Sequence, residues 1–517
     1  MIKKISQNIY CYILPLILGA ITSFSLPPYN LLLINFLTFP LWLLFLIEVK
    51  KRNSIWLNFV IGWFFGIGYF FSNIYWIVYS LTFEDIFKPL IPIALVLIPS
   101  FLGLFYGIIT LLASLFRLSK DFSSVLIFSV IFASVEFIRG FIFGGFPWNL
   151  IVYSLTNYIN FLQVLSLIGT YSLNLILITI FLFPIVIFFK KKIELKFVTS
   201  ILLLIFLGFN HFYGYQKINS DKKLYSEFNN FSIKIVSPKI SIERFFQANN
   251  EKDIIEELID LSNPNILQKT IFIFPEGALA GVNLVQLKNF KKIFSEKFSE
   301  SDLIIMGINT EKIENNSNKI YNSMVILDNK LNLIHEYNKI KLVPFGEFLP
   351  FENFFKRMGL RKVSFGYESF SPGYNRDLII LDDLNFNFIP LICYEIIYSG
   401  KINLIPSKTD FIINISEDGW FGNSIGPYQH FSHSIFRAIE EGKNIIRASN
   451  NGISAYIDSN GLIINKIEST ESGVIEINNY KSVKKTFFSK YNNKIFFYFI
   501  IFYIILIFFN FKKREKS

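Results

Sequence analysis

Long apolar runs fill the first 213 positions of the chain and return once near its end. A helix needs roughly 20 apolar residues to cross the hydrocarbon core of a bilayer. Lys3 and Lys4 precede the first run, but no small-residue cleavage site follows it, so we expect an anchor and not a removed leader. The pattern predicts eight spanning helices, at residues 8–24, 31–48, 55–80, 89–116, 123–143, 160–189, 197–213 and 491–511.

The polar stretch between the last two spans, residues 214–490, alternates short β-rich runs with amphipathic stretches. This alternation predicts an α/β domain with one central core. We therefore expect a membrane domain at 1–213, a water-facing domain at 214–490, and a spanning helix with a basic tail at 491–517. Strands are predicted at 231–237, 270–274, 302–309, 323–328, 331–337, 386–392 and 411–416, a hairpin joins 453–458 to 462–467, and helices are predicted at 251–261, 284–298 and 428–444.

Basic residues gather on every second loop between the predicted spans. The chain carries a net charge of +11, and its charges lie beside apolar runs, a pattern that indicates membrane orientation and not nucleic-acid binding. The loops at 25–30, 81–88 and 144–159 are poor in Lys and Arg. By the positive-inside rule both termini are cytoplasmic and residues 214–490 lie on the outer face. The basic clusters are Lys3–Lys4, Lys50–Arg52, Arg117 with Lys120, Lys190–Lys192 and Lys512–Arg514.

Cysteine and histidine are scarce, which narrows the chemistry that the chain can perform. Cys11 lies in the first apolar run and Cys393 in the polar region, so no disulfide is expected. Because the chain has only four histidines, His-based catalysis and metal sites with several His ligands are less favoured. His430 and His433 are three residues apart, a spacing that more often places two side chains on one helix face than at a metal.

Three predicted strands run directly into residues that can carry chemistry. The strand at 270–274 runs into Pro275 and Glu276, the strand at 386–392 runs into Cys393, and the strand at 411–416 runs into the Glu417–Gly422 segment. Ligand sites gather beyond the carboxyl ends of strands in α/β sheets, so we expect a shared pocket. A thiol needs a base or a nearby cation to react, and Glu276 serves as that base if burial raises its pKa. Lys339 lies in a further segment with residues that can carry chemistry. It would stabilise the thiolate and the oxyanion of an acyl-transfer intermediate.

Each of these residues also has a structural interpretation. A lone cysteine after a buried strand is usually a small core residue, a glutamate after proline is often solvated, and a lysine is usually on the surface. Their order is more informative than any one of them. Phe274-Pro275-Glu276, Tyr337-Asn338-Lys339 and Ile392-Cys393-Tyr394-Glu395 resemble the Glu-Lys-Cys signatures of the nitrilase superfamily. Within it, the segments Leu342–Glu347, Arg139-Gly140 with Gly145–Trp148, Gly419–Gly422 with Gly426–Phe431, and Arg447–Gly452 resemble the apolipoprotein N-acyltransferase family.

The resemblance implies a nitrilase-like α-β-β-α sandwich on a polytopic α-helical membrane bundle. It implies that Glu276 is the general base, Lys339 the oxyanion stabiliser and Cys393 the nucleophile, with no metal or organic cofactor. The supporting residues that it implies are Glu347, which would orient Lys339, Tyr394 and Glu395, which would shape the pocket, and Trp420, on a mobile loop touching lipid.

The activity implied by the resemblance is acyl transfer in a bacterial inner membrane, with residues 214–490 in the periplasm. A phospholipid, expected to be phosphatidylethanolamine, would acylate Cys393, and the N-terminal amine of a diacylglyceryl-cysteine lipoprotein would accept the chain. Two rivals stay open: a membrane-tethered amidase that hydrolyses its thioester, and a transporter or scaffold with a binding domain. The main ionisable residues of the spans, Glu136 and Arg139, lie one helical turn apart and are expected to pair, which is thin support for a translocation path.

The chain departs from the family pattern at three places around the expected site. Glu417 stands where the family usually has Asn, and Ser237–Ile240 replaces a Gln-x-Asn-Ile segment. The aromatic residue that usually follows is a tryptophan, and here Phe245 or Phe246 takes its place. These departures bear on the entrance of the acyl chain or peptide.

Overall fold

The protein is described by a computed structural model. It covers residues 2–50, 54–116, 118–188, 193–220, 225–228, 230–245, 251–279, 281–314, 317–352, 357, 362, 369–402, 409–482 and 485–515. Several residues used in the predictions lie outside these ranges, namely Lys51, Arg52, Arg117, Lys190–Lys192 and Phe246. The chain forms two compact units: a membrane unit of Met1–Val78, Pro89–Asp221 and Thr486–Ser517, and an α/β unit of Tyr79–Lys88 and Lys222–Lys485.

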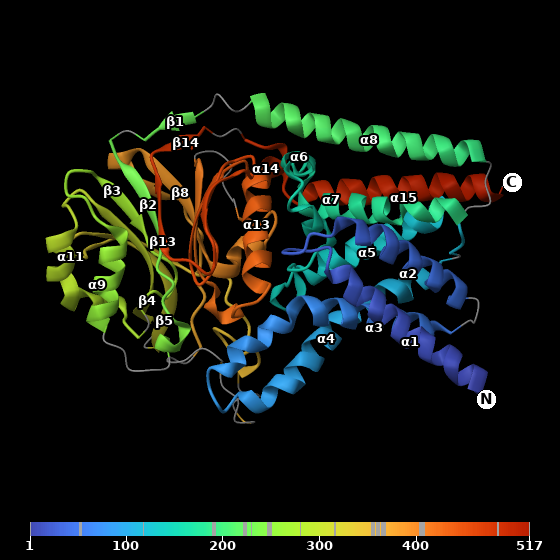
Figure 1. The fold of residues 1–517 in the computed structure, drawn as a ribbon, viewed down its shortest axis with the longest axis horizontal. Helices are drawn as coiled ribbons and strands as arrows, with labels where there is room; N and C mark the ends of the chain where they lie inside the picture. The colour runs from blue at the N-terminus through green and yellow to red at the C-terminus, as the bar shows by residue number, and fades with distance from the viewer. Residues whose placement is uncertain are drawn as a thin grey trace. The chain divides into compact units, whose positions relative to one another are not determined.

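Helices occupy each of the eight predicted spans of the membrane unit (Figure 1). They are α1 (Ile2–Ser23), α2 (Asn35–Lys50), α3 (Ile55–Ile74), α4 (Ile91–Ser114), α5 (Phe122–Arg139), α7 (Leu165–Leu182), α8 (Ile193–Ser220) and α15 (Lys494–Glu515). Five segments of the described chain are long and apolar enough to cross a membrane: Leu32–Val49, Ile55–Thr82, Lys88–Ser114, Phe122–Arg139 and Leu165–Phe188. The protein is therefore a membrane protein with a helical bundle, as the hydrophobic pattern predicts.

Small residues let the helices of the membrane unit approach one another closely. A Cβ added at Gly19 of α1 would lie 1.9 Å from the Phe65 carbonyl oxygen of α3, so α1 and α3 touch through their backbones. Trp42 stacks on Phe65 with 3.8 Å between the ring centroids. The expected pair within α5 is confirmed, because Arg139 Nη2 lies 3.0 Å from Glu136 Oε2 and both side chains are buried.

Two six-stranded sheets form the centre of the α/β unit. The first has the order β13-β2-β3-β4-β5-β6 and the second β12-β11-β10-β9-β8-β7. In Figure 1, α9 and α11 lie on the outer face of the first sheet and α13 on the outer face of the second, which confirms the predicted α-β-β-α sandwich. The bounds are β2 (Ser232–Ser237), β3 (Thr270–Ile273), β4 (Leu303–Glu314), β5 (Ser317–Asp328), β6 (Leu333–Asn338), β7 (Ile379–Leu381), β8 (Phe386–Ile392), β9 (Phe411–Glu417), β10 (Asn444–Asn450), β11 (Ser454–Ile457), β12 (Ile463–Ile467), β13 (Gly473–Ile477), α9 (Glu251–Ser262), α11 (Lys291–Lys297) and α13 (Gly426–Glu441).

The predicted helix over 428–444 runs too far, because its last residue begins a strand. The α13 helix ends at Glu441, where Gly442 takes the left-handed conformation with φ 62°. Asn444 then opens β10, which pairs in parallel with β9 and is buried throughout. Because β10 contains polar residues such as Arg447, a search for apolar runs does not predict it as a strand.

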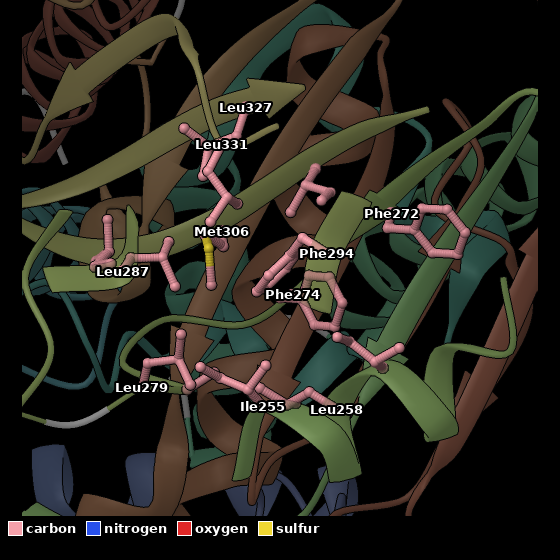
Figure 2. Close-up of a cluster of buried hydrophobic side chains, with 14 of the residues drawn as sticks. Ile255, Leu258, Phe272, Phe274, Leu279, Leu287, Phe294, Met306, Leu327 and Leu331 are labelled. Atoms are coloured by element: carbon pink, nitrogen blue, oxygen red, sulfur yellow. The ribbon is translucent and has the colours of Figure 1, made fainter. Parts of the chain in front are cut away.

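A cluster of buried apolar side chains holds α9 and α11 against the first sheet. Figure 2 shows Ile255 and Leu258 of α9 beside Phe274, at the end of β3. Burying each such side chain stabilises the fold by about 1.5–3 kcal/mol. The cluster thereby fixes the end of β3, two residues before Glu276.

Candidate active site

Glu276 is held at the junction between the end of β3 and the neighbouring strand β4. The Phe274 N–H donates to the Ile305 carbonyl at 2.8 Å, and the Gly307 N–H donates to the Pro275 carbonyl at 3.3 Å. A Cβ at Gly307 would lie 2.6 Å from Glu276 Cα, so glycine is needed for this close approach. The Glu276 residue is only 8% exposed.

Lys339 follows β6 directly and bridges two carboxylates. Its Nζ lies 3.1 Å from Glu276 Oε1 and 2.8 Å from Glu347 Oε1, and the side chain is 1% exposed. Burial by itself lowers the pKa of Lys339, but Glu276, Glu347 and Cys393 together raise that pKa well above its usual value. Lys339 is therefore an ammonium ion at neutral pH.

Asn322, in the middle of β5, belongs to the same cluster and was missed in the sequence. Its Nδ2 donates to Glu276 Oε1 and to Glu347 Oε1, each at 2.7 Å. Its backbone carbonyl accepts the Lys339 N–H at 2.9 Å. A polar residue within a buried strand was the available signal, but no spacing motif marks it. Glu347 is fixed further by the Val343 N–H, which donates to its Oε2 at 2.8 Å.

Cys393 occupies a strained turn directly after β8. Its φ of 52° is in the left-handed region, where a residue with a side chain costs about 1–3 kcal/mol. The following residues form a 3₁₀ turn, η11 (Cys393–Ile397). Burial raises the pKa of the Cys393 thiol, Glu276 raises it further, and Lys339 only partly offsets them. The thiol is therefore protonated at neutral pH, and the structure brings Glu276, Lys339 and Cys393 into one electrostatically coupled group.

A buried polar network lies behind Cys393. Asn414 Nδ2 donates to the Cys393 carbonyl at 3.2 Å, and Arg447 Nη1 donates to the Asn414 side-chain oxygen. Arg447 Nη2 also lies 2.8 Å from Asp418 Oδ2, and His430 Nδ1 lies 2.9 Å from Asp418 Oδ1. The network ties β9 and β10 to the strained turn, and it gives His430 a structural partner.

Glu395 is buried and fastens the segment after Lys339 to the turn at Cys393. Its carboxylate accepts hydrogen bonds from two side chains and three backbone N–H groups. The donors are Tyr337 Oη (2.9 Å), Arg376 Nη2 (2.9 Å), and the N–H groups of Ile340 (3.1 Å), Lys341 (3.1 Å) and Ile392 (2.9 Å). Tyr394 donates its hydroxyl to the Leu342 carbonyl at 3.1 Å. Both side chains thus brace the site instead of pointing freely into it.

Trp420 packs between two phenylalanines of the α/β unit. Its ring centroid lies 5.5 Å from that of Phe245 and 5.8 Å from that of Phe83. Phe83 belongs to the Tyr79–Lys88 segment, which connects α3 to α4 in sequence. A Cβ at Gly422 would lie 2.5 Å from the Tyr79 ring, so the same segment covers the residues after Trp420. Phe245 is thus the aromatic residue that the described chain places beside Gly277, at the end of β3.

This arrangement joins a thiol, a carboxylate and a cation that act on one another electrostatically. Those are the groups that acyl transfer through a thioester requires. In the described part of the chain, no group of three or more His, Cys, Asp or Glu side chains is arranged to hold a metal ion.

Comparison with known proteins finds similarity over both units of the chain. Residues 18–183 match the family model of the apolipoprotein N-acyltransferase N-terminal domain, and residues 273–478 match that of the carbon-nitrogen hydrolases. A protein of Brucella melitensis named apolipoprotein N-acyltransferase is 30% identical over 89% of this chain and 87% of its own length. One of Rickettsia prowazekii with the same name is 31% identical over 86% of this chain and 88% of its own length. The solved structure of Saccharomyces cerevisiae Nit3, of the nitrilase superfamily, is 15% identical over 50% of this chain and 92% of its own, with a TM-score of 0.35.

Proposed function

The chain belongs to the apolipoprotein N-acyltransferase family, and on that premise we propose that it carries a fatty acyl group on Cys393, from a membrane phospholipid to a lipoprotein amine. The acceptor is the N-terminal amine of a diacylglyceryl-cysteine, and phosphatidylethanolamine is the donor. The convergence of Glu276, Lys339 and Cys393 is the observation that carries the proposal.

In the first half-reaction, Cys393 Sγ attacks the ester carbonyl of the phospholipid while Glu276 accepts the thiol proton. Transfer to a base must accompany attack, because the raised pKa of Cys393 keeps the thiol protonated. The Lys339 ammonium group and the Tyr394 N–H, at the start of η11, stabilise the oxyanion. The C–O bond then breaks, and Glu276 returns the proton to the departing lysophospholipid.

In the second half-reaction, the lipoprotein amine attacks the thioester carbonyl. Glu276 accepts a proton from the attacking nitrogen, the C–S bond breaks, and Cys393 leaves as a thiolate that recovers that proton. The product is an amide, and the enzyme returns to its starting state. Glu347 and Asn322 hold Lys339 and Glu276 in place through both steps.

Exposed aromatic residues in the segment after Lys339 suit substrates whose acyl chains lie in a bilayer. Phe345 and Phe351 follow Lys339 in the chain and are 48% and 81% exposed. Apolar surface of this kind favours contact with lipid. We place the enzyme in the bacterial inner membrane, with both termini cytoplasmic and residues 214–490 periplasmic, on the strength of the basic loops.

The test is to trap the thioester. Purified protein is incubated with phosphatidylethanolamine vesicles, and the Cys393 peptide is examined by mass spectrometry for an added acyl group. We expect acylation in the wild type and none in Cys393→Ala. A wild-type protein that transfers acyl chains without ever acylating Cys393 would refute the proposed path.

The same assay separates transfer from hydrolysis. A transferase releases about one lysophospholipid per enzyme and then stops until lipopeptide is added. An amidase-like enzyme of the same superfamily would keep releasing product without an acceptor, because water would resolve its thioester. Continuous release would assign the site to the rival activity.

A further inference from the structure

We propose that a buried ion pair, Arg244 with Glu417, positions the Glu276 carboxylate for proton transfer. The inference rests on the proposed role of Glu276 as general base. It begins from the two oxygens of that carboxylate. Lys339 and Asn322 donate to Oε1, whereas Oε2 accepts the backbone N–H of Glu417 at 3.0 Å. The N–H of Glu417 therefore fixes the rotation of the carboxylate about its last bond.

The backbone of Glu417 is in turn fixed by its own side chain. Its Oε1 accepts the Gly419 N–H at 2.9 Å, which caps the short turn after β9. Its Oε2 accepts Asn450 Nδ2 at 2.7 Å and the Nη2 group of Arg244. The Glu417 side chain is 1% exposed, so each of these bonds forms away from water, where bonds to a charged group are strongest.

Arg244 connects Glu417 to the residue that follows the base. Its Nη2 donates to the Gly277 carbonyl at 2.8 Å, and its Nη1 donates to the carbonyls of Ile240 (3.0 Å) and Ser241 (2.6 Å). One guanidinium thus contacts both sides of Glu276, at Gly277 along the chain and at Glu417 across the sheets.

Arg244 and Glu417 bring two opposite charges together away from water, with side chains that are 3% and 1% exposed. A buried pair is costly to form, and removing one partner leaves the other charge unpaired. Burial raises the pKa of Glu417, and Arg244 partly offsets that rise. The pair therefore acts as a unit.

The experiment measures the single-turnover rate of Cys393 acylation against pH in wild type, Glu417→Gln and Arg244→Met. We expect each single variant to slow acylation by about 10- to 100-fold, within the range that general-base catalysis supplies, at unchanged phospholipid KM. The acidic limb of the pH profile should move to lower pH in Glu417→Gln, because a negative charge near Glu276 is lost. It should move to higher pH in Arg244→Met, because a positive charge is lost.

Lys481→Met is the matched control, because it breaks another buried ion pair of the α/β unit, between Lys481 Nζ and Asp458 Oδ2 at 3.1 Å. We expect it to lower the melting temperature and leave the acylation profile of the folded enzyme in place. If the single variants fold poorly, Glu417→Asn and Arg244→Lys take their place. Glu417→Asn removes the same negative charge and should move the acidic limb to lower pH. Arg244→Lys keeps the positive charge, so it should slow acylation while the acidic limb stays nearly in place. The inference is overturned if the variants keep wild-type acylation rates and pH profiles. It is also overturned if their acylation rates fall no further than that of Lys481→Met and the acidic limb does not move. Absence of acyl-Cys393 in the wild type refutes instead the proposed function.

Discussion

Cys393 combines a raised thiol pKa with a neighbouring acid and a neighbouring cation that act on it in opposite directions. Glu276 disfavours the thiolate and Lys339 favours it. A resting thiol of this kind is protected from oxidants, which attack the thiolate. Reactivity then appears only when a substrate carbonyl is in place and the proton has somewhere to go.

The first prediction concerns alkylation of Cys393 by iodoacetamide, followed by mass spectrometry of its peptide. The rate should keep rising with pH above about 8.5, the ordinary thiol pKa, because the folded pKa is higher. Glu276→Gln should move the rise to lower pH by removing a negative charge, and Lys339→Met should move it to higher pH. Equal profiles in all three proteins would contradict the electrostatic coupling.

The second prediction concerns Asp418. Burial alone raises the pKa of this carboxyl, but Arg447 and His430 lower it well below its usual value. Its contribution to stability is therefore complete above about pH 3.9 and is lost as pH falls through the lower folded value. Asp418→Asn leaves Arg447 without its carboxylate, which costs about 3–5 kcal/mol at neutral pH.

Thermal unfolding in detergent at several pH values checks this second prediction. The gap in melting temperature between wild type and Asp418→Asn should be large at pH 7 and should narrow as the solution becomes strongly acidic. Asp377→Asn changes an exposed carboxylate and should leave the melting temperature nearly unchanged. A gap that widens on acidification would show that the sign is wrong.

The ends of predicted strands marked the candidate site, because parallel neighbours bring their carboxyl ends to one edge. Glu276 and Cys393 could be predicted as site residues for that reason, and Lys339 could be predicted from its motif. Asn322 could not be predicted as a site residue, because it is 46 residues from Glu276 and lies within a strand. Arg244 is 173 residues from Glu417, and no local pattern predicts that the two meet.

At the scale of elements, apolar periodicity predicted the spans and most strands of both sheets. It missed β10, whose buried polar residues serve the network behind Cys393 and so break the apolar run. It also placed the Tyr79–Lys88 segment with the membrane domain, because its neighbours in sequence are spans. Its contacts through Phe83 and Tyr79 belong to the α/β unit.

The third prediction tests that segment. Phe83→Ala removes one of the two rings against Trp420, so the residues around Trp420 should exchange backbone hydrogen for deuterium faster, by roughly tenfold for each 1.4 kcal/mol of packing lost. Ile86→Ala is the control in the same segment, because Ile86 is 61% exposed and should leave exchange unchanged. Equal exchange in the two variants would mean that Phe83 does not hold Trp420.

At the scale of the whole molecule, the basic loops make a prediction about sidedness. In a Cys11→Ser, Cys393→Ser background, Ser301→Cys lies on the exposed surface of the α/β unit and should react with a membrane-impermeant maleimide in cells whose outer membrane alone is permeable. Lys120→Cys, in a predicted cytoplasmic loop, should react only after lysis. The reverse result would invert the proposed topology.

The path of the polypeptide between its units has a consequence for biosynthesis. The chain changes unit four times, after Val78, Lys88, Asp221 and Lys485. A ten-residue segment of the α/β unit is therefore translated long before the rest of that unit. This segment and the rest of the unit must reach the same side of the bilayer in order to pack together. A fragment expressed from residue 222 onward would lack Tyr79 and Phe83 and would leave Trp420 partly uncovered. Residues 222–485 alone therefore do not make up the whole α/β unit.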